Sequence, residues 1–188
     1  MSFEKDIEKS LETLKSGGLI LYPTDTVWGI GCDATNKKAV ENIYKLKRRS
    51  DEKAMIVLVA DEKAIMQHVA APDLSLFDYL DKTTKPTTVV YDGALGFAEN
   101  LVAKNGSVAI RICKDDFCRQ LIKRFRKSVV STSANISGTP APKIFKEITD
   151  EIKNGVDYVV QYRQDDKTFS EPSSLIKWIN GNVTVLRE

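Results

Sequence analysis

Hydrophobic side chains recur along this chain with two distinct periods. Apolar residues three or four positions apart predict amphipathic helices. The first such set is Phe3, Ile7, Leu11 and Leu14, with Ser2 as a candidate N-cap and Gly17-Gly18 as the stop. The same spacing predicts helices over residues 39–46, 62–69, 73–82, 117–125 and 143–153, the fourth of them after a candidate cap at Asp115.

Short apolar runs between turn residues predict buried strands. They occupy residues 19–22, 54–60, 87–91, 107–112, 129–131, 158–162, 174–178 and 183–186, whereas 23–36 are expected to form a loop. Asn180-Gly181 predicts a tight hairpin between the last two strands, because both central turn positions favour a positive φ. Helices and strands interleave but the end is a hairpin. We therefore expect one α/β (α+β) domain over residues 1–188, with helices packed on a mixed parallel and antiparallel sheet.

Composition narrows the class of protein. The chain has 188 residues, of which 42% are hydrophobic, and a formal net charge of +2. This length and apolar content suit one domain with a core. The near-neutral charge argues against a strongly cationic nucleic-acid binder, although a local basic cleft would not appear in the sum.

Cysteine usage and the N-terminus bear on the compartment. Cys32, Cys113 and Cys118 have no metal-ligand spacing, and their odd number fits a reducing environment, so we interpret them as buried apolar side chains. The N-terminus does not resemble a signal sequence, and no apolar run approaches the ~20 residues needed to span a bilayer. The sequence therefore predicts a soluble cytoplasmic protein that holds no metal of its own and does not enter a membrane.

Polar residues that suit ligand binding follow the first predicted strand. The segment Pro23-Thr24-Asp25-Thr26-Val27-Trp28-Gly29 offers two hydroxyls and a carboxylate at a strand end, where ligand sites gather in α/β proteins. Thr24 and Asp25 are equally suited to form a capping or Asx-type turn. Both interpretations remain open on this segment alone.

Two further segments could bind a nucleotide. Lys47-Arg48-Arg49 lies at a helix end, where cations either complement the helix dipole or grip phosphate. Residues 131–138 read Ser-Thr-Ser-Ala-Asn-Ile-Ser-Gly, which is an ordinary polar loop or a hydrogen-bonding surface for a nucleotide or amino acid. No Walker A loop and no activated nucleophile is apparent. An enzyme built from these parts would act by positioning and by stabilising phosphate charge.

Taken in order, these motifs resemble the YrdC-like family of L-threonylcarbamoyladenylate synthases. The resemblance runs from Gly17-Gly18 to Arg187 and rests on Pro-Thr-Asp-Thr, Lys-x-Arg and Ser-Thr-Ser-Ala-Asn-x-Ser-Gly. It implies a concave, positively charged cavity on a twisted mixed sheet. It also implies that L-threonine, bicarbonate and ATP give threonylcarbamoyladenylate and pyrophosphate, for tRNA modification completed by separate transfer proteins. ATP is then a substrate, Mg²⁺ is carried mainly by ATP, and tRNA itself is a candidate partner.

The resemblance assigns roles by position. Lys47, Arg49, Ser133 and Asn135 match Lys-x-Arg and Ser-x-Asn and are implied to be the catalytic residues lining the nucleotide and carbamate site. Substrate or nucleotide contacts are implied for Thr24, Thr88, Arg111, Ser131, Ser173 and Arg187, with Thr24 against the threonine. The chain departs from the family pattern at Trp28, Lys143, Lys177 and 84–88, and the extra C-terminal domain of some relatives is not expected after Glu188.

Two other functions are compatible with the residues. A non-catalytic RNA-binding or ribosome-maturation factor would use Lys47-Arg48-Arg49 together with Lys123-Arg124 and Arg126-Lys127 to grip phosphates. A paralogue of the same fold would act on a different small molecule. The sequence does not predict the oligomeric state.

Overall fold

The computed structural model describes residues 3–49 and 55–188, so the candidate cap Ser2 and the expected strand start at Ala54 lie outside the described residues. The helices are α1 (Glu4–Lys15), α2 (Lys37–Leu46), α3 (Glu62–His68), α4 (Ser75–Lys82), α5 (Asp116–Phe125) and α6 (Asp150–Asn154), with a 3-10 turn η1 (Phe145–Glu147). The strands are β1 (Ile20–Tyr22), β2 (Gly29–Gly31), β3 (Ile56–Val59), β4 (Thr87–Tyr91), β5 (Val108–Ile112), β6 (Val129–Ser133), β7 (Tyr158–Val159), β8 (Ser174–Ile179) and β9 (Asn182–Arg187).

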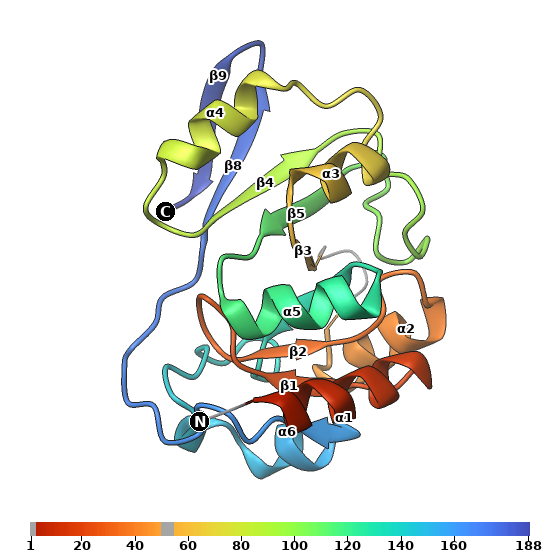
Figure 1. Cartoon of the computed structure of the whole chain (residues 1–188), viewed down its shortest axis with the longest axis vertical. Coiled ribbons are helices and arrows are strands. Elements are labelled where there is room, and N and C mark those ends of the chain that lie inside the picture. Colours follow the sequence, from red (N-terminus) through yellow and green to blue (C-terminus); the bar gives the residue numbers. More distant parts are fainter. Residues whose placement is uncertain (1–2, 50–54) are drawn as a thin grey trace.

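These strands form one sheet in the order β7-β1-β2-β6-β3-β5-β4-β8-β9 (Figure 1). Strand pairs β1–β7, β3–β5 and β4–β8 are parallel, and the other five pairs are antiparallel. The expected mixed sheet is therefore confirmed, as is the final hairpin, whose turn residues Asn180 and Gly181 have φ of 50° and 78°.

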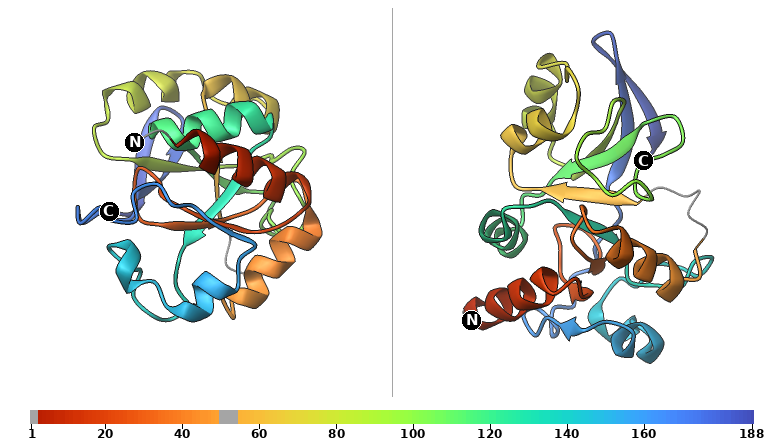
Figure 2. Two further views of the ribbon diagram at one scale, coloured as in Figure 1. Left: turned by 60° about the horizontal axis from the view of Figure 1, so that its bottom comes forward. Right: turned by 90° about the vertical axis from the view of Figure 1, so that its right-hand side faces the viewer.

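Helices cover the two faces of the sheet unequally (Figure 2, left). Helices α1, α3, α4 and α5 lie on one face, and α2 and α6 lie on the other. Helix α1 packs against α5, and Phe3, immediately before α1, forms an edge-to-face pair with Phe117 of α5 at 5.6 Å between ring centroids. Part of the face that carries α2 and α6 is thereby left without a covering helix, and the polar motifs lie there.

Strand β2 was not predicted from the sequence. It lies within residues 23–36, which were expected to form a loop. Glycine is depleted in strands, so Gly-Ile-Gly carries no strand signal. The strand forms because β1 and β6 pair with it on both sides. Its glycines leave room for the ring of Tyr22. A Cβ at Gly31 would lie 2.6 Å from Tyr22 Cε1 and 2.8 Å from the carbonyl oxygen of Val130.

Gly31→Ala is therefore expected to destabilise the protein. Overpacking of a filled site typically costs about 1–3 kcal/mol of unfolding free energy, and here both clashing atoms belong to buried neighbours. Urea unfolding followed by circular dichroism would measure the loss. An unchanged midpoint would contradict the close packing of Tyr22 on β2.

The predicted cap of α5 is confirmed, but the helix expected over 143–153 differs from the observed structure. Asp115 Oδ1 accepts a hydrogen bond of 2.9 Å from the amide of Cys118, so α5 begins where the sequence predicts. The expected helix over 143–153 is instead η1 followed by α6. Ile148 and Thr149 between them are extended, and Ile148 is 2% exposed. Burial of this apolar side chain interrupts the helix.

Candidate active site

A cavity of about 500 Å³ lies on the face that carries α2. This volume falls within the usual range for small-molecule sites. Seven of the ten residues assigned to the site from the sequence line it: Arg49, Arg111, Ser131, Ser133, Asn135, Ser173 and Arg187. The structure thus brings together residues from β5, β6, the segment before β8, the end of β9 and the turn after α2.

The charge of the cavity has one sign. Arg49, Arg111 and Arg187 line it, and no aspartate or glutamate is among its described lining residues. Hydroxyl and amide groups supply most of the remaining polar lining. Arginine forks of this kind bind carboxylates and phosphates. The cavity is therefore built for an anionic ligand with further hydrogen-bonding groups.

The side chains of Lys47, Arg48 and Arg49, directly after α2, have different surroundings. Arg48 adopts a left-handed conformation, with φ of 50°, and its exposed guanidinium pairs with Glu151 Oε1 at 2.7 Å. Arg49 turns into the cavity, where burial lowers the pKa of its guanidinium. Lys47 is 1% exposed and does not line the cavity. Its Nζ contacts the 133–135 loop, and its role as a catalytic residue stays a prediction.

Lys47 holds the backbone of the Ser133–Asn135 loop. Its Nζ donates to the carbonyl oxygens of Ser133 at 2.5 Å and Asn135 at 2.6 Å, while its own carbonyl accepts from the amide of Ser137 at 2.8 Å. Burial and the charge of Arg49 lower the pKa of Lys47 to about 7. The carbonyl acceptors oppose that shift by favouring the ammonium form.

The side chains of this loop are also held in place. Ser133 Oγ donates to Asn135 Oδ1 at 2.5 Å, and Asn135 Nδ2 donates to the carbonyl of Thr139 at 2.6 Å. These contacts orient the Asn135 amide before any ligand arrives. A preformed arrangement lowers the entropy that binding must offset.

Thr24 forms a turn and does not line the cavity. Its buried hydroxyl accepts from the amide of Thr26 at 3.0 Å and donates to the carbonyl of Val27 at 2.8 Å. Of the two interpretations of this segment, the turn is therefore present. Thr26, which we did not assign to the site, lines the cavity instead. As the second hydroxyl of Pro-Thr-Asp-Thr, it was available as a signal.

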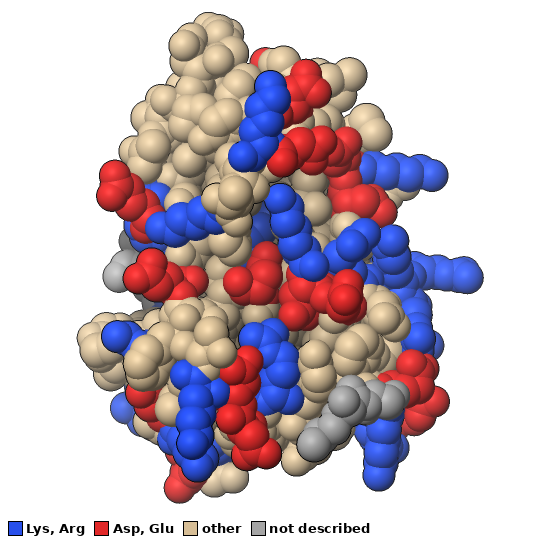
Figure 3. Space-filling view, turned by 60° about the vertical axis from the view of Figure 1, so that its left-hand side comes forward, with Lys and Arg blue, Asp and Glu red and all other residues tan. Residues whose placement is uncertain are grey.

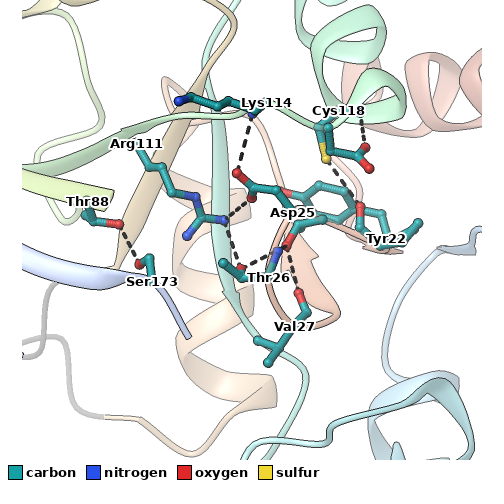
Figure 4. A network of polar contacts seen from close by, with 12 residues as sticks. Tyr22, Asp25, Thr26, Val27, Thr88, Arg111, Lys114, Cys118 and Ser173 are labelled. Atoms are coloured by element: carbon teal, nitrogen blue, oxygen red, sulfur yellow. Dashed lines mark hydrogen bonds and ion pairs between the residues drawn. The ribbon is translucent and has the colours of Figure 1, made fainter. Parts of the chain in front are cut away.

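Arg111 is buried and ion-paired. Its Nη2 donates to Asp25 Oδ1 at 2.9 Å and to Thr26 Oγ1 at 3.1 Å (Figure 4). The side chains of Arg111 and Asp25 are 3% and 10% exposed. Pairing at this depth is needed, because an unpaired buried charge is strongly destabilising.

Thr88 supports the site from outside the cavity. Its Oγ1 lies 2.7 Å from Ser173 Oγ, and the residue is fully buried (Figure 4). Ser173 lines the cavity, and its carbonyl accepts from Arg187 Nη2 at 2.9 Å. The contacts connect β4, β8 and β9 at one wall of the cavity.

A second cavity of about 490 Å³ lies on the opposite face of β5. From Ala109 to Ile112 the side chains alternate as expected along a strand: Ala109 and Arg111 line the first cavity, and Ile110 and Ile112 line the second. Val108, the first residue of β5, also lines the first cavity. Asp25 also lines the second cavity. Its apolar lining and its mixture of acidic and basic side chains suit an anion less well than the arginine-rich cavity does.

Basic side chains outside the cavity are interspersed with acidic ones. Figure 3 shows blue and red side chains intermixed over one face. Arg124 pairs with Glu4, Lys127 pairs with Asp33, and Arg48 pairs with Glu151. Three of the seven cations proposed for an RNA grip are thus used in ion pairs among the described residues, which weakens the case for that function.

Two absences hold for residues 3–49 and 55–188. No group of three or more histidine, cysteine, aspartate or glutamate side chains is placed to bind a metal ion. None of the helices in these ranges has the length and apolarity that a membrane span requires.

A family model described as "Telomere recombination", for Sua5, YciO and YrdC proteins, matches residues 12–188. The chain belongs to this Sua5–YciO–YrdC family. The resemblance found in the sequence is thereby confirmed. In this member of the family, the site that could bind a substrate is the arginine-rich cavity on the sheet.

Named relatives are similar over nearly the whole of this Sua5–YciO–YrdC chain. A putative threonylcarbamoyl-AMP synthase of Methanocaldococcus jannaschii is 33% identical over 193 residues, covering 98% of this chain and 88% of the relative. A threonylcarbamoyl-AMP synthase of Idiomarina loihiensis is 29% identical over 171 residues, covering 88% and 90%. P. abyssi Sua5 complexed with L-threonine shares the fold with a TM-score of 0.86 at 20% identity. It is covered over 54% of its length, so this chain spans about half of it, and 98% of this chain is covered.

Proposed function

We propose that the protein is an L-threonylcarbamoyladenylate synthase, which converts L-threonine, bicarbonate and ATP to threonylcarbamoyladenylate and pyrophosphate. The observation that carries the proposal is the convergence of three arginines with the Ser133 and Asn135 loop on one cavity of about 500 Å³. Similarity to a relative named threonylcarbamoyl-AMP synthase and to one named putative threonylcarbamoyl-AMP synthase supports it.

The cavity suits the charges of this reaction. The amine of threonine and bicarbonate first form the carbamate with loss of water. A carbamate oxygen then attacks the α-phosphorus of ATP, the bond from this phosphorus to the bridging β-phosphate oxygen breaks, and pyrophosphate leaves. Negative charge then builds on phosphate oxygens, which Arg49, Arg111 and Arg187 are placed to stabilise. Ser131, Ser133 and Asn135 orient the nucleotide and carbamate. The carbamate is already anionic, so the step requires no protein nucleophile and no general base.

Mg²⁺ is not held by this chain's own side chains in the proposal. The described lining of the cavity contains no carboxylate, and the described residues contain no metal-binding group of three. Mg²⁺ prefers oxygen ligands and keeps several waters, so it enters with the ATP phosphates.

Pyrophosphate release tests the proposal. Purified protein is incubated with ATP and bicarbonate, with and without L-threonine, and mass spectrometry detects the adenylate. We expect release that depends on both threonine and bicarbonate. Well-folded protein that binds ATP but releases no pyrophosphate with threonine would refute the proposal, and release with a different amino acid would identify the paralogue.

The reaction is proposed to supply a later step of tRNA modification and to take place in the cytoplasm. The product is an activated acyl-adenylate, which a separate transferase must consume by transfer to tRNA. Buried cysteines that form no disulfide fit a cytoplasmic site of action.

A further inference from the structure

Asp25 and Thr26 lie against the guanidinium of Arg111 (Figure 4). Asp25 Oδ1 and Thr26 Oγ1 both accept from Arg111 Nη2, at 2.9 and 3.1 Å. Asp25 Oδ2 faces the amide of Lys114 at 3.4 Å, immediately beyond β5. The partners of Arg111 thus lie about 86 positions earlier in the chain and hold one nitrogen of its fork.

The hydroxyls of this segment form a chain with a single direction. Thr24 has one hydroxyl proton and donates it to the carbonyl of Val27, because a carbonyl oxygen only accepts. Thr24 Oγ1 therefore accepts from the Thr26 hydroxyl, 3.0 Å away. The Thr26 proton is then committed, and its oxygen is left to accept from Arg111.

Arg111 keeps donors for a ligand while it is held in this way. It lines the cavity, and its buried Nε has no hydrogen-bond partner among the described residues. Its pairing with Asp25 and Thr26 uses Nη2 only. An arginine held at one nitrogen presents the rest of its fork in a fixed orientation, which favours bidentate contact with an anion.

We infer that Thr24, Asp25 and Thr26 form a socket that positions Arg111 for the anionic substrate. This inference rests on the proposed function for the identity of the ligand. Asp25 and the Thr26 hydroxyl act through Arg111, and Thr24 acts through Thr26. The order of polar groups in Thr24-Asp25-Thr26 thus serves to position Arg111, and Thr24 has a role other than contact with threonine.

The test compares Asp25→Ala and Thr26→Val in the pyrophosphate assay. We expect kcat/KM to fall about 100-fold for Asp25→Ala, as misplacement of a substrate-binding group commonly does. For Thr26→Val we expect about tenfold, the equivalent of one hydrogen bond. Added formate should partly restore Asp25→Ala, because the vacated carboxylate position borders the second cavity. A merely structural defect would not respond to formate in this way.

The same substitutions are then made with Arg111→Met. If the socket acts only through Arg111, neither change lowers kcat/KM further by more than about twofold. Asp25→Ala/Arg111→Met also avoids an unpaired buried charge, so it remains informative if Asp25→Ala alone fails to fold. A full additional loss in the Arg111→Met background would overturn the inference.

The chain supplies a matched control in Asp33. This carboxylate is 7% exposed, pairs with Lys127 at 2.6 Å and accepts from the Thr35 hydroxyl at 2.7 Å, but it lines neither large cavity. Asp33→Ala should lower stability and leave kcat/KM within about twofold, as expected for independent sites. An activity loss as large as that of Asp25→Ala would indicate a general folding effect and overturn the inference.

Crystal structures separate this inference from the proposed function. In Asp25→Ala/Thr26→Val the Arg111 guanidinium should leave its wild-type position whatever the substrate is. Displacement together with an inactive wild type would refute the function and keep the socket. An unmoved guanidinium would refute the socket even if the wild-type enzyme is active.

Discussion

Arg49→Ala is expected to lower kcat/KM for threonine-dependent pyrophosphate formation by about 10²–10³-fold. Removing one group that stabilises developing charge in a partly enclosed site costs about that much. Arg49 lines the cavity and is half-buried, so water replaces its guanidinium poorly. The measurement is steady-state pyrophosphate release with ATP, bicarbonate and threonine each varied in turn.

The neighbouring residue is the control for this result. Arg48 has the same charge and sits one position away, but its exposed guanidinium pairs with Glu151 and does not line the cavity. Arg48→Ala should change kcat/KM by no more than about twofold, since surface ion pairs contribute little. Equal losses in the two variants would contradict the placement of Arg49 as the ligand-binding cation of Lys-x-Arg.

Lys47→Met is expected to change how stability depends on pH. Burial and Arg49 lower the pKa of Lys47 to about 7 in the folded state, against an ordinary value of 10.5. Between these values the unfolded chain binds more protons than the folded one, so this residue makes stability rise with pH. Its unfavourable effect grows as pH falls from 10.5 and is complete below about 7. The slope reaches at most ~1.4 kcal/mol per pH unit.

The difference between wild type and Lys47→Met isolates this effect. Burial raises the pKa of Cys32 and Cys118, which makes stability fall as their unfolded thiols ionise at higher pH. Those contributions cancel in the difference. Urea unfolding at pH 7, 8 and 9 should show the wild type gaining stability relative to Lys47→Met. A constant difference would mean that the carbonyls of Ser133 and Asn135 keep the folded pKa near its ordinary value.

The elements with regular apolar spacing were predictable, and those that depend on neighbours were not. Helix α5 begins at the predicted cap because Asp115 acts within its own first turn. β2 has no local signal, since its glycines make room for Tyr22 and its strand partners come from elsewhere in the chain. The break between η1 and α6 likewise reflects burial of Ile148 rather than local preference.

The candidate site divides in a similar way. The motifs identified the segments, and seven of the ten assigned residues line one cavity. The motif Lys-x-Arg does not reveal which cation faces the ligand, because the directions of Lys47 and Arg49 depend on the left-handed Arg48 between them. Nor does a sequence show that the Thr24 hydroxyl is already used within its turn. Such facts depend on where donors and acceptors meet in space.

The lining of the cavity is drawn from Thr26 through Arg187, and this has a consequence for the order in which the protein is made. A nascent chain can pair β1 with β2 early, but the wall that contains Ser173 and Arg187 is synthesised last. ATP stabilises only a form that binds it, so it cannot assist any earlier folding intermediate. We therefore expect nucleotide to bind only after the last strands have folded. A chain stalled on the ribosome before β8 should gain no protection from ligand against proteolysis.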